Sequence, residues 1–149
     1  MKESCNTIFK YWFPVILLMS VIFWMSTSTF SAENTSSIIE PLLRFLMSEL
    51  SLRTLNMIHG LIRKCGHIIE YFILGLLLFR AFRGNSKESR IRYWAFSSII
   101  VVILYAASDE FHQSFVSTRT ASVIDVVFDT TGGILAQAVS ALRHRQSLK

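Results

Sequence analysis

The sequence predicts an all-α fold: a polytopic membrane helix bundle with about four transmembrane helices and an outer amphipathic helical segment. Composition is the first reason, because 52% of the 149 residues are hydrophobic and only 17% are charged, against roughly 25% charged residues in ordinary soluble domains. The mean hydropathy of +0.45 excludes a disordered chain, a disulfide scaffold and most soluble enzymes. The length predicts a single domain over residues 1–149.

Four stretches are apolar and long enough to cross a bilayer, which takes roughly 17–25 helical residues. They cover about residues 11–30, 66–82, 91–107 and 122–142. Lys10 flanks the first stretch, and Trp12 and Trp24 suit the two membrane interfaces. A cleaved signal peptide is the alternative for the first stretch, but its apolar run is long for that role. The fourth stretch qualifies although it contains two aspartates.

The distribution of lysine and arginine predicts a multi-pass protein of the cell membrane with both termini in the cytoplasm. The short loop RAFRGNSKESRIR, between the second and third spans, carries the densest positive charge. It is most simply a topology signal, with contact to anionic lipid as a further role. The formal net charge of +5 therefore indicates a lipid bilayer as the partner and not a nucleic acid.

The outer segment between the first two spans, residues 31–64, carries helix signals. Ser37 and Glu40 have the spacing of a capping box, and Pro41 suits a first helical turn. Apolar residues then recur at helical spacing: Leu42, Leu43, Leu46, Met47 and Leu50. This pattern predicts an amphipathic helix that either lies on the outer leaflet or packs across the outer mouth of the bundle. Thr54 is a candidate start for a further helix that runs into the second span.

Ionisable residues lie inside two predicted spans, where each costs about 2.5–3.5 kcal/mol on insertion scales. Lys64, His67 and Tyr71 share one face of the second span at i, i+3 and i+7, and Glu70 lies beside that face. In the fourth span Asp125 and Asp129 share a face at i, i+4. Gly132 and Gly133 extend this second face inward, and such small residues let a neighbouring helix approach closely.

A third polar group follows the third span and comprises Asp109, Glu110, His112, Gln113 and Arg119. The predicted topology places all three groups at the outer end of the membrane. We therefore expect one partly hydrated pocket that opens outward. The alternative is a set of buried ion pairs, joining Lys64 or Arg119 to Asp125 or Asp129, which only stabilises the bundle.

The residue types favour acid–base or anion-binding chemistry in this pocket. His67 or His112 is a candidate general acid or base, with carboxylates from the set Glu70, Asp109, Glu110, Asp125 and Asp129. The predicted ligand contacts come from Lys64, Tyr71, Gln113 and Arg119, of which the two cations suit a phosphate or carboxylate. No zinc signature is present, so we expect neither a metal nor a cofactor. Cys5 and Cys65 are expected to be free thiols, and His59 and His144 ordinary surface residues.

These residues resemble the VanZ-like family of small bacterial membrane proteins. The resemblance is carried by Lys64-x-x-His67-x-x-Glu70-Tyr71, SDEFHQSF at 108–115, Arg119, D-x-x-x-D-x-x-G-G at 125–133, and Trp24 and Ser26. It covers most of the chain from the first span onward. Two departures stand out: Arg63 where many members have Asp, and Ser117-Thr118 where many have Pro-Gly.

The family is named for a protein associated with resistance to teicoplanin, a glycopeptide antibiotic with a lipid tail. The resemblance implies an integral protein of the cell envelope that modulates glycopeptide susceptibility. Its outward pocket would engage an envelope ligand such as a lipid-linked cell-wall precursor or a lipoglycopeptide. Two alternatives stay open: a membrane enzyme acting on a lipid head group, and a small proton- or ion-coupled transporter that uses Asp125 and Asp129.

Overall fold

The computed structural model describes residues 2–46, 51–86, 90–117 and 121–146. Within these ranges the chain is helical and has no strand, as predicted. The elements are α1 (Lys2–Met25), the 3₁₀ turn η1 (Ser28–Phe30), α2 (Ala32–Leu46), α3 (Leu52–Arg83), α4 (Ile91–Gln113) and α5 (Val123–Gln146). Four of them, α1, α3, α4 and α5, are long and apolar enough to cross a membrane. The prediction of an all-α, multi-pass membrane protein is confirmed.

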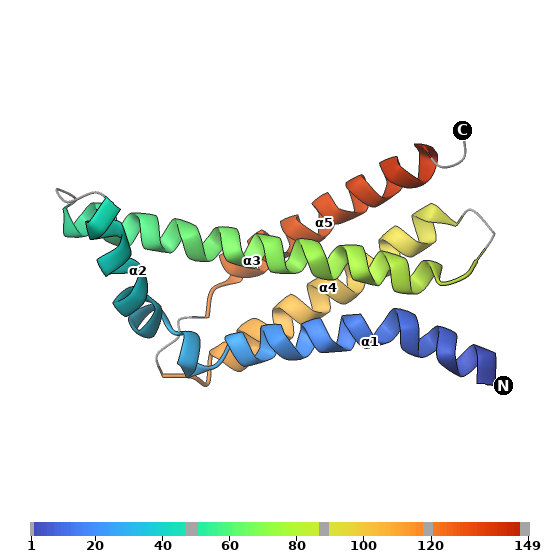
Figure 1. Cartoon of the computed structure of the whole chain (residues 1–149), viewed down its shortest axis with the longest axis horizontal. Coiled ribbons are helices and arrows are strands. Elements are labelled where there is room, and N and C mark those ends of the chain that lie inside the picture. The colour runs from blue at the N-terminus through green and yellow to red at the C-terminus, as the bar shows by residue number, and fades with distance from the viewer. Residues whose placement is uncertain (1, 47–50, 87–89, 118–120, 147–149) are drawn as a thin grey trace.

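The four long helices run lengthwise through the molecule, with α4 and α5 inclined to α1 and α3 (Figure 1). One end of the bundle holds both ends of the chain and the connection from α3 to α4, and we call it the terminal end. The opposite end holds α2 and the connections that lead from α1 to α3 and from α4 to α5, and we call it the loop end. By the lysine and arginine distribution, the terminal end is predicted to be cytoplasmic.

Two helix bounds differ from the spans predicted by hydropathy. The first long helix ends at Met25, several residues before the predicted end of its span, because the chain turns into η1. The third helix begins at Leu52 rather than at Thr54 or Gly66, since the Ser51 side chain accepts a hydrogen bond from the Thr54 backbone N–H at 3.2 Å. At about 1.5 Å per residue, the 32 residues of α3 are long enough to extend beyond the bilayer.

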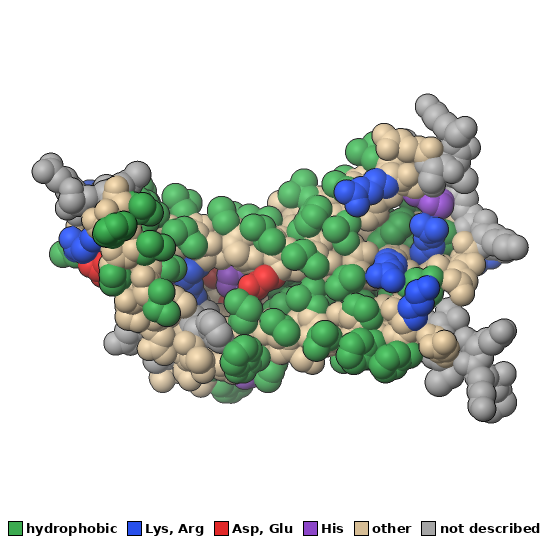
Figure 2. Space-filling view, viewed as in Figure 1, with side chains coloured by type: hydrophobic (Ala, Val, Ile, Leu, Met, Phe, Trp, Pro, Cys, Tyr) green, Lys and Arg blue, Asp and Glu red, His purple; other side chains and the backbone are tan. Residues whose placement is uncertain are grey.

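The centre of the bundle is α3, which packs most extensively on α5 and also contacts α1, α4 and α2. Its inward side chains form the apolar core with partners from α1 and α4: Val15, Ile22, Tyr71, Leu74, Leu78, Ala81, Val102 and Ala106. Large apolar side chains elsewhere on the four long helices are exposed, and hydrophobic side chains cover much of the surface in Figure 2. An apolar exterior around an apolar core is typical of a bundle surrounded by lipid.

Close approach of α5 to its neighbours depends on glycine, as the spacing of Gly132 and Gly133 predicts. A Cβ atom at Gly132 would overlap the backbone carbonyl oxygen of Ile68 in α3. A Cβ atom at Gly133 would lie 2.7 Å from the Val102 side chain in α4. On the facing side, the backbone carbonyl of Gly75 accepts a hydrogen bond from the Gln137 side chain at 3.0 Å. These contacts pack α5 closely against α3 and α4.

The start of α2 corrects one prediction. The helix begins at Ala32, and the Ser31 hydroxyl accepts a hydrogen bond from the Asn34 backbone N–H at 3.3 Å. Ser37 is an interior residue whose hydroxyl donates back to the Asn34 carbonyl, and Glu40 forms an ion pair with Arg44. The proposed capping box is therefore wrong, and Pro41 lies inside the helix rather than in its first turn.

The amphipathic character predicted for α2 is present. Its half-buried side chains Ile39 and Leu43 line a small cleft against Leu55 of α3. A second apolar row remains exposed and consists of Ile38, Leu42 and Phe45. This helix thus packs on the loop end of the bundle with one row and leaves the other free for the membrane interface.

Candidate functional site

A polar cavity of about 130 Å³ lies toward the loop end of the bundle. It is lined by side chains from α1, α2, α3 and α4: Ile22, Met25, Ser26, Thr35, Arg63, Gly66, His67, Glu70 and Asp109. In Figure 2 basic, histidine and acidic side chains appear together in the hollow between α1 and α3. Polar groups from the turn after α1 and from α2, α3 and α4 therefore meet in one place.

The α3 side of the cavity is a polar face with helical spacing. Arg63, His67 and Glu70 stand at i, i+4 and i+7, and because successive residues are about 100° apart they fall within a sector of about 60°. Lys64 and Tyr71 project about 80–100° away from Arg63, toward α5 and the core. His67 lies between the two directions, so its ring borders the cavity and also reaches α5.

His67 is paired with the buried aspartate of α5. The Nδ1 atom of His67 lies 3.4 Å from Oδ1 of Asp129. The Asp129 side chain is 0% exposed, whereas that of His67 is 24% exposed. A carboxylate beside an imidazole orients the ring and stabilises its protonated form. Of the residues that line the polar cavity, His67 is therefore the best candidate for a general acid or base, with Asp129 as the carboxylate that orients it.

The α4 side of the cavity carries a second buried carboxylate. Asp109 is 3% exposed, and its Oδ2 atom accepts a hydrogen bond from the Gln113 side chain at 3.0 Å. The neighbouring Glu110 accepts a hydrogen bond from the Ser122 backbone N–H at 2.8 Å, which fastens the end of α4 to the start of α5. Asp109 thus lines the cavity, whereas Glu110 links α4 to the start of α5.

Several buried polar atoms near the cavity have no hydrogen-bond partner within the described part of the chain. They are Ser26 Oγ, Tyr71 Oη, Asp109 Oδ1 and both Asp129 carboxylate oxygens. Buried polar groups are rarely left unsatisfied in folded proteins. Of these atoms, Ser26 Oγ and Asp109 Oδ1 belong to residues that line the cavity, where they can bind water or the hydroxyl and amine groups of a polar ligand.

The structure brings together only some of the residues predicted for the site. His67, Glu70 and Asp109 line the cavity, Asp129 pairs with His67, and Gln113 contacts the cavity through Asp109. Asp125 lies in the first turn of α5 and interacts electrostatically with Arg63.

Other predicted residues do not line the polar cavity. The Lys64 ammonium lies over the Phe128 ring, 4.8 Å from its centroid. Tyr71 is fully buried in the core, and the His112 ring packs against Phe23 of α1 with centroids 4.4 Å apart. Glu110 also lies outside the cavity lining. Arg119 lies outside the described residues, so its predicted role as an anion clamp stays a prediction.

Sequence reasoning missed Arg63 as a cavity residue, although it noted that this position departs from the pattern of many VanZ-like proteins. Its spacing to His67 and Glu70 is the signal that would have identified it. Ser26 was noted only as part of the resemblance, and the structure makes it a buried cavity residue, 4% exposed.

Two histidines predicted as ordinary surface residues make specific contacts instead. His59 Nε2 lies 3.1 Å from the Thr35 hydroxyl and so links α3 to α2. The His144 ring packs edge-on against Trp94 of α4. Across the residues that the structure describes, no group of three or more histidine, cysteine or acidic residues is placed to hold a metal ion. The side chains of the polar cavity can take part in hydrogen bonding and proton transfer.

Comparison with known proteins identifies the family. The sequence model of the VanZ/LLP1 family matches residues 11–143, which include α3 and α4 whole, most of α1 and α5, and every residue of the polar cavity. No curated protein and no solved structure matches the chain. This match extends over far more than half of the sequence, and the chain belongs to the VanZ/LLP1 family.

Proposed function

We propose that this protein binds the polar head of a lipid-linked or other envelope ligand in the polar cavity and thereby modulates glycopeptide susceptibility, including susceptibility to teicoplanin. The observation that carries the proposal is the convergence of Arg63, His67, Glu70 and Asp109 on one hollow within an apolar bundle. Charged groups at membrane depth are costly and are retained mainly where they serve an ion or substrate path.

The chemistry of the cavity supports a ligand with hydroxyl or amine groups. Two carboxylates, Glu70 and Asp109, face one guanidinium, Arg63, and the buried carboxylate of Asp129 stands behind His67. This acidic balance favours hydrogen-bond donors over a bare anion. Sugar and amine groups on a lipid carrier supply such donors.

The size of the cavity supports recognition of a head group and not of a whole antibiotic. Its volume of about 130 Å³ is below the roughly 300–1,000 Å³ of pockets that enclose drug-sized ligands. A small polar fragment fits, while the lipid tail of the same molecule stays in the bilayer beside α1 and α3. The predicted topology puts this end of the bundle at the outer face, where glycopeptides and cell-wall precursors meet.

The test expresses the protein in a teicoplanin-sensitive host and compares the wild type with Glu70→Gln and Asp109→Asn. We expect the wild type to change the inhibitory concentration of teicoplanin more than that of a glycopeptide without a lipid tail, and both variants to lose this effect. The matched control is Glu40→Gln, which removes an exposed carboxylate on α2 and should behave as wild type. Membrane levels of every variant are compared by immunoblot.

A direct binding measurement accompanies this test. Purified protein in detergent is titrated with a lipid-linked cell-wall precursor and, in parallel, with a phospholipid of equal chain length. We expect saturable binding of the precursor that weakens about tenfold or more in Glu70→Gln, as for the loss of one charged hydrogen bond. Equal binding of both lipids, or full antibiotic tolerance in both variants, would contradict the proposed function.

A second candidate function is catalysis on a lipid head group, favoured by the pairing of His67 with Asp129. The imidazole would act as the general acid or base, and the carboxylate would orient it. Incubation of the purified protein with the precursor, followed by mass spectrometry of the lipid, tests this function. Product formation that is lost in His67→Gln while precursor binding is retained would select the enzyme over the binding protein.

A further inference from the structure

A second, larger cavity lies at the terminal end of the bundle, opposite to the polar cavity. Its volume is about 510 Å³, within the range of about 300–1,000 Å³ that is typical of ligand pockets. Side chains from α1, α3 and α5 line it: Tyr11, Leu76, Leu77, Phe79, Arg80, Arg83, Ser140, Arg143 and His144, with Gly84 just after α3. We call it the basic cavity.

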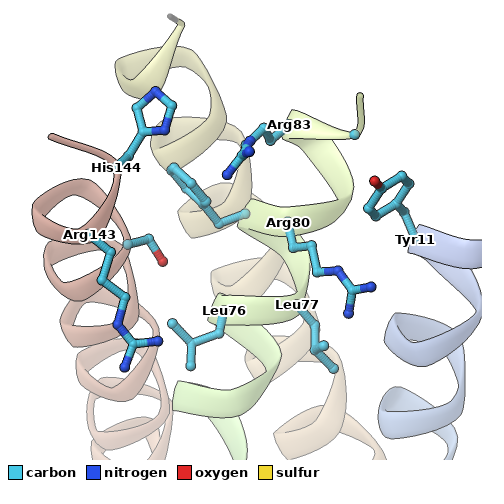
Figure 3. Close-up of a pocket in the computed structure, with 10 residues that line it drawn as sticks. Tyr11, Leu76, Leu77, Arg80, Arg83, Arg143 and His144 are labelled. Carbon is cyan, nitrogen blue, oxygen red and sulfur yellow. The ribbon is translucent and has the colours of Figure 1, made fainter. Parts of the chain in front are cut away.

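Three arginines surround the opening of the basic cavity. Figure 3 shows Arg143 on one side, Arg83 near the top and Arg80 on the side that faces Tyr11. The Arg80 guanidinium lies 5.4 Å from the centroid of the Tyr11 ring, and the Tyr11 hydroxyl donates a hydrogen bond to the Asn85 side chain at 2.7 Å. The aromatic ring thus fixes one wall of the cavity and orients its nearest cation.

The positive charge of the basic cavity is not neutralised by the described protein. No acidic residue lines it, and none of its three arginines forms an ion pair among the residues that the structure describes. The C-terminal ends of α3 and α5 each contribute roughly half a negative charge, which offsets about one of the three guanidinium charges. A net positive charge of about two remains around the opening.

The part of the basic cavity farther from the end of α3 is apolar. Leu76, Leu77 and Phe79 precede Arg80 along α3, so the lining changes from apolar to cationic toward the end of the helix. An amphiphile with an anionic head and an apolar body has the same gradient. Guanidinium groups form paired hydrogen bonds with phosphate oxygens, and basic pockets between membrane helices bind anionic lipid head groups.

We propose that the basic cavity binds the phosphate of an anionic phospholipid from the leaflet at the terminal end. Arg80, Arg83 and Arg143 hold the phosphate oxygens, and Leu76 and Leu77 contact the glycerol and upper acyl carbons. The bound lipid joins α1, α3 and α5 at this end of the bundle. This site is separate from the polar cavity, and neither depends on the other.

Native mass spectrometry of the full-length protein in detergent tests the proposal. Phosphatidylglycerol, cardiolipin and phosphatidylcholine are titrated in parallel, and an apparent Kd is obtained for each. We expect the two anionic lipids to bind at least about tenfold more tightly than the zwitterionic one. We also expect Arg143→Gln to weaken their binding by about tenfold, the size of one charge-assisted hydrogen bond, and Arg80→Gln/Arg143→Gln to abolish the preference.

The matched control is Arg92→Gln, which removes the same charge from an exposed position near the start of α4 outside the cavity lining. We expect it to bind all three lipids as wild type does. Equal weakening in Arg92→Gln and Arg143→Gln would show a diffuse surface charge effect and overturn the site. Displacement of bound lipid by inorganic phosphate alone, with no preference among the three lipids, would overturn the lipid assignment. Arg143→Lys keeps the positive charge and should retain part of the preference for anionic lipids. If Arg143→Lys loses the preference as completely as Arg143→Gln does, the loss comes from misfolding and not from the missing charge.

Discussion

The Nδ1 atom of His67 lies 3.4 Å from the Oδ1 atom of Asp129, and this contact joins the two most extensively packed helices of the bundle, α3 and α5. The aspartate side chain is fully buried, so its charge depends on the histidine for compensation. Buried pairs stabilise less than well-packed apolar groups do, but removing one partner alone is strongly destabilising. His67 and Asp129 therefore affect both the stability of the bundle and the proton chemistry of the polar cavity.

This dependence predicts a non-additive double-mutant cycle. His67→Leu leaves the Asp129 carboxylate buried and unpaired, and we expect it to lower the free energy of unfolding by about 3–5 kcal/mol. His67→Leu/Asp129→Leu removes both polar groups and should recover much of that loss. Unfolding in detergent, followed by circular dichroism, measures these two variants and the single variant Asp129→Leu. A double variant as unstable as the sum of the single variants would show that the pair does not couple.

Glycine packing predicts a difference between two neighbouring positions. Gly132→Ala should cost about 1–3 kcal/mol, because its Cβ meets a backbone carbonyl oxygen of α3 that has little freedom to move. Gly133→Ala should cost less, since its Cβ meets the side chain of Val102. Gly60→Ala is the control: no atom lies within 4 Å of its added Cβ, so alanine should stabilise α3 by up to about 1 kcal/mol. Thermal unfolding ranks the stabilities of the three alanine variants. An equal loss of stability in Gly60→Ala and Gly132→Ala would contradict the close approach of α5 to α3.

The exposed apolar row of α2 predicts contact with the membrane interface. Phe45 is 84% exposed, and burial of such a ring in the bilayer boundary is favourable. In a variant without Cys5 and Cys65, a fluorophore on Phe45→Cys should be quenched by brominated lipids in reconstituted vesicles. The same fluorophore on Arg44→Cys, at the polar face, should be quenched much less. Equal quenching at both positions would indicate that α2 stands away from the bilayer.

The bundle itself could be predicted from the sequence because length, apolar content and glycine spacing are properties of each helix alone. The orientation of α3 about its axis could not. A rotation of about one residue, or 100°, decides whether Lys64 or Arg63 faces the polar cavity, and that rotation depends on packing against α1 and α5. The contact of His112 with Phe23 is likewise a tertiary contact between distant segments, with no local signal.

The start of α2 could not be predicted from the sequence for a different reason. Ser37 and Glu40 have the stronger local capping signature, but Ser31 directly follows η1 and caps the helix first. The connection from α1 therefore decides where α2 begins, and a local pattern does not contain that information.

Loop charges predict which end of the bundle is cytoplasmic. A fluorescent protein fused after Lys149 should be fluorescent, and alkaline phosphatase at the same position should be inactive, because that enzyme needs an oxidising compartment. Alkaline phosphatase inserted after Ser114, at the loop end, should be active. The opposite pattern would place the polar cavity at the cytoplasmic face and remove the basis for its contact with external glycopeptides.

The neighbours Arg63 and Lys64 give the sharpest test of the polar cavity. Each carries one positive charge on the same turn of α3, but Arg63 lines the cavity and Lys64 lies over the Phe128 ring. Arg63→Gln should weaken binding of a lipid-linked precursor by about tenfold or more, since a charged hydrogen bond is lost. Lys64→Gln should leave binding within about twofold and cost only the weak cation–π contact, about 0.5–1 kcal/mol of stability at an exposed site. Because the two variants change charge equally, any general effect of surface potential cancels in the comparison. The reverse ranking, with Lys64→Gln losing binding and Arg63→Gln retaining it, would move the ligand to the α3–α5 side and favour the anion clamp expected from the sequence.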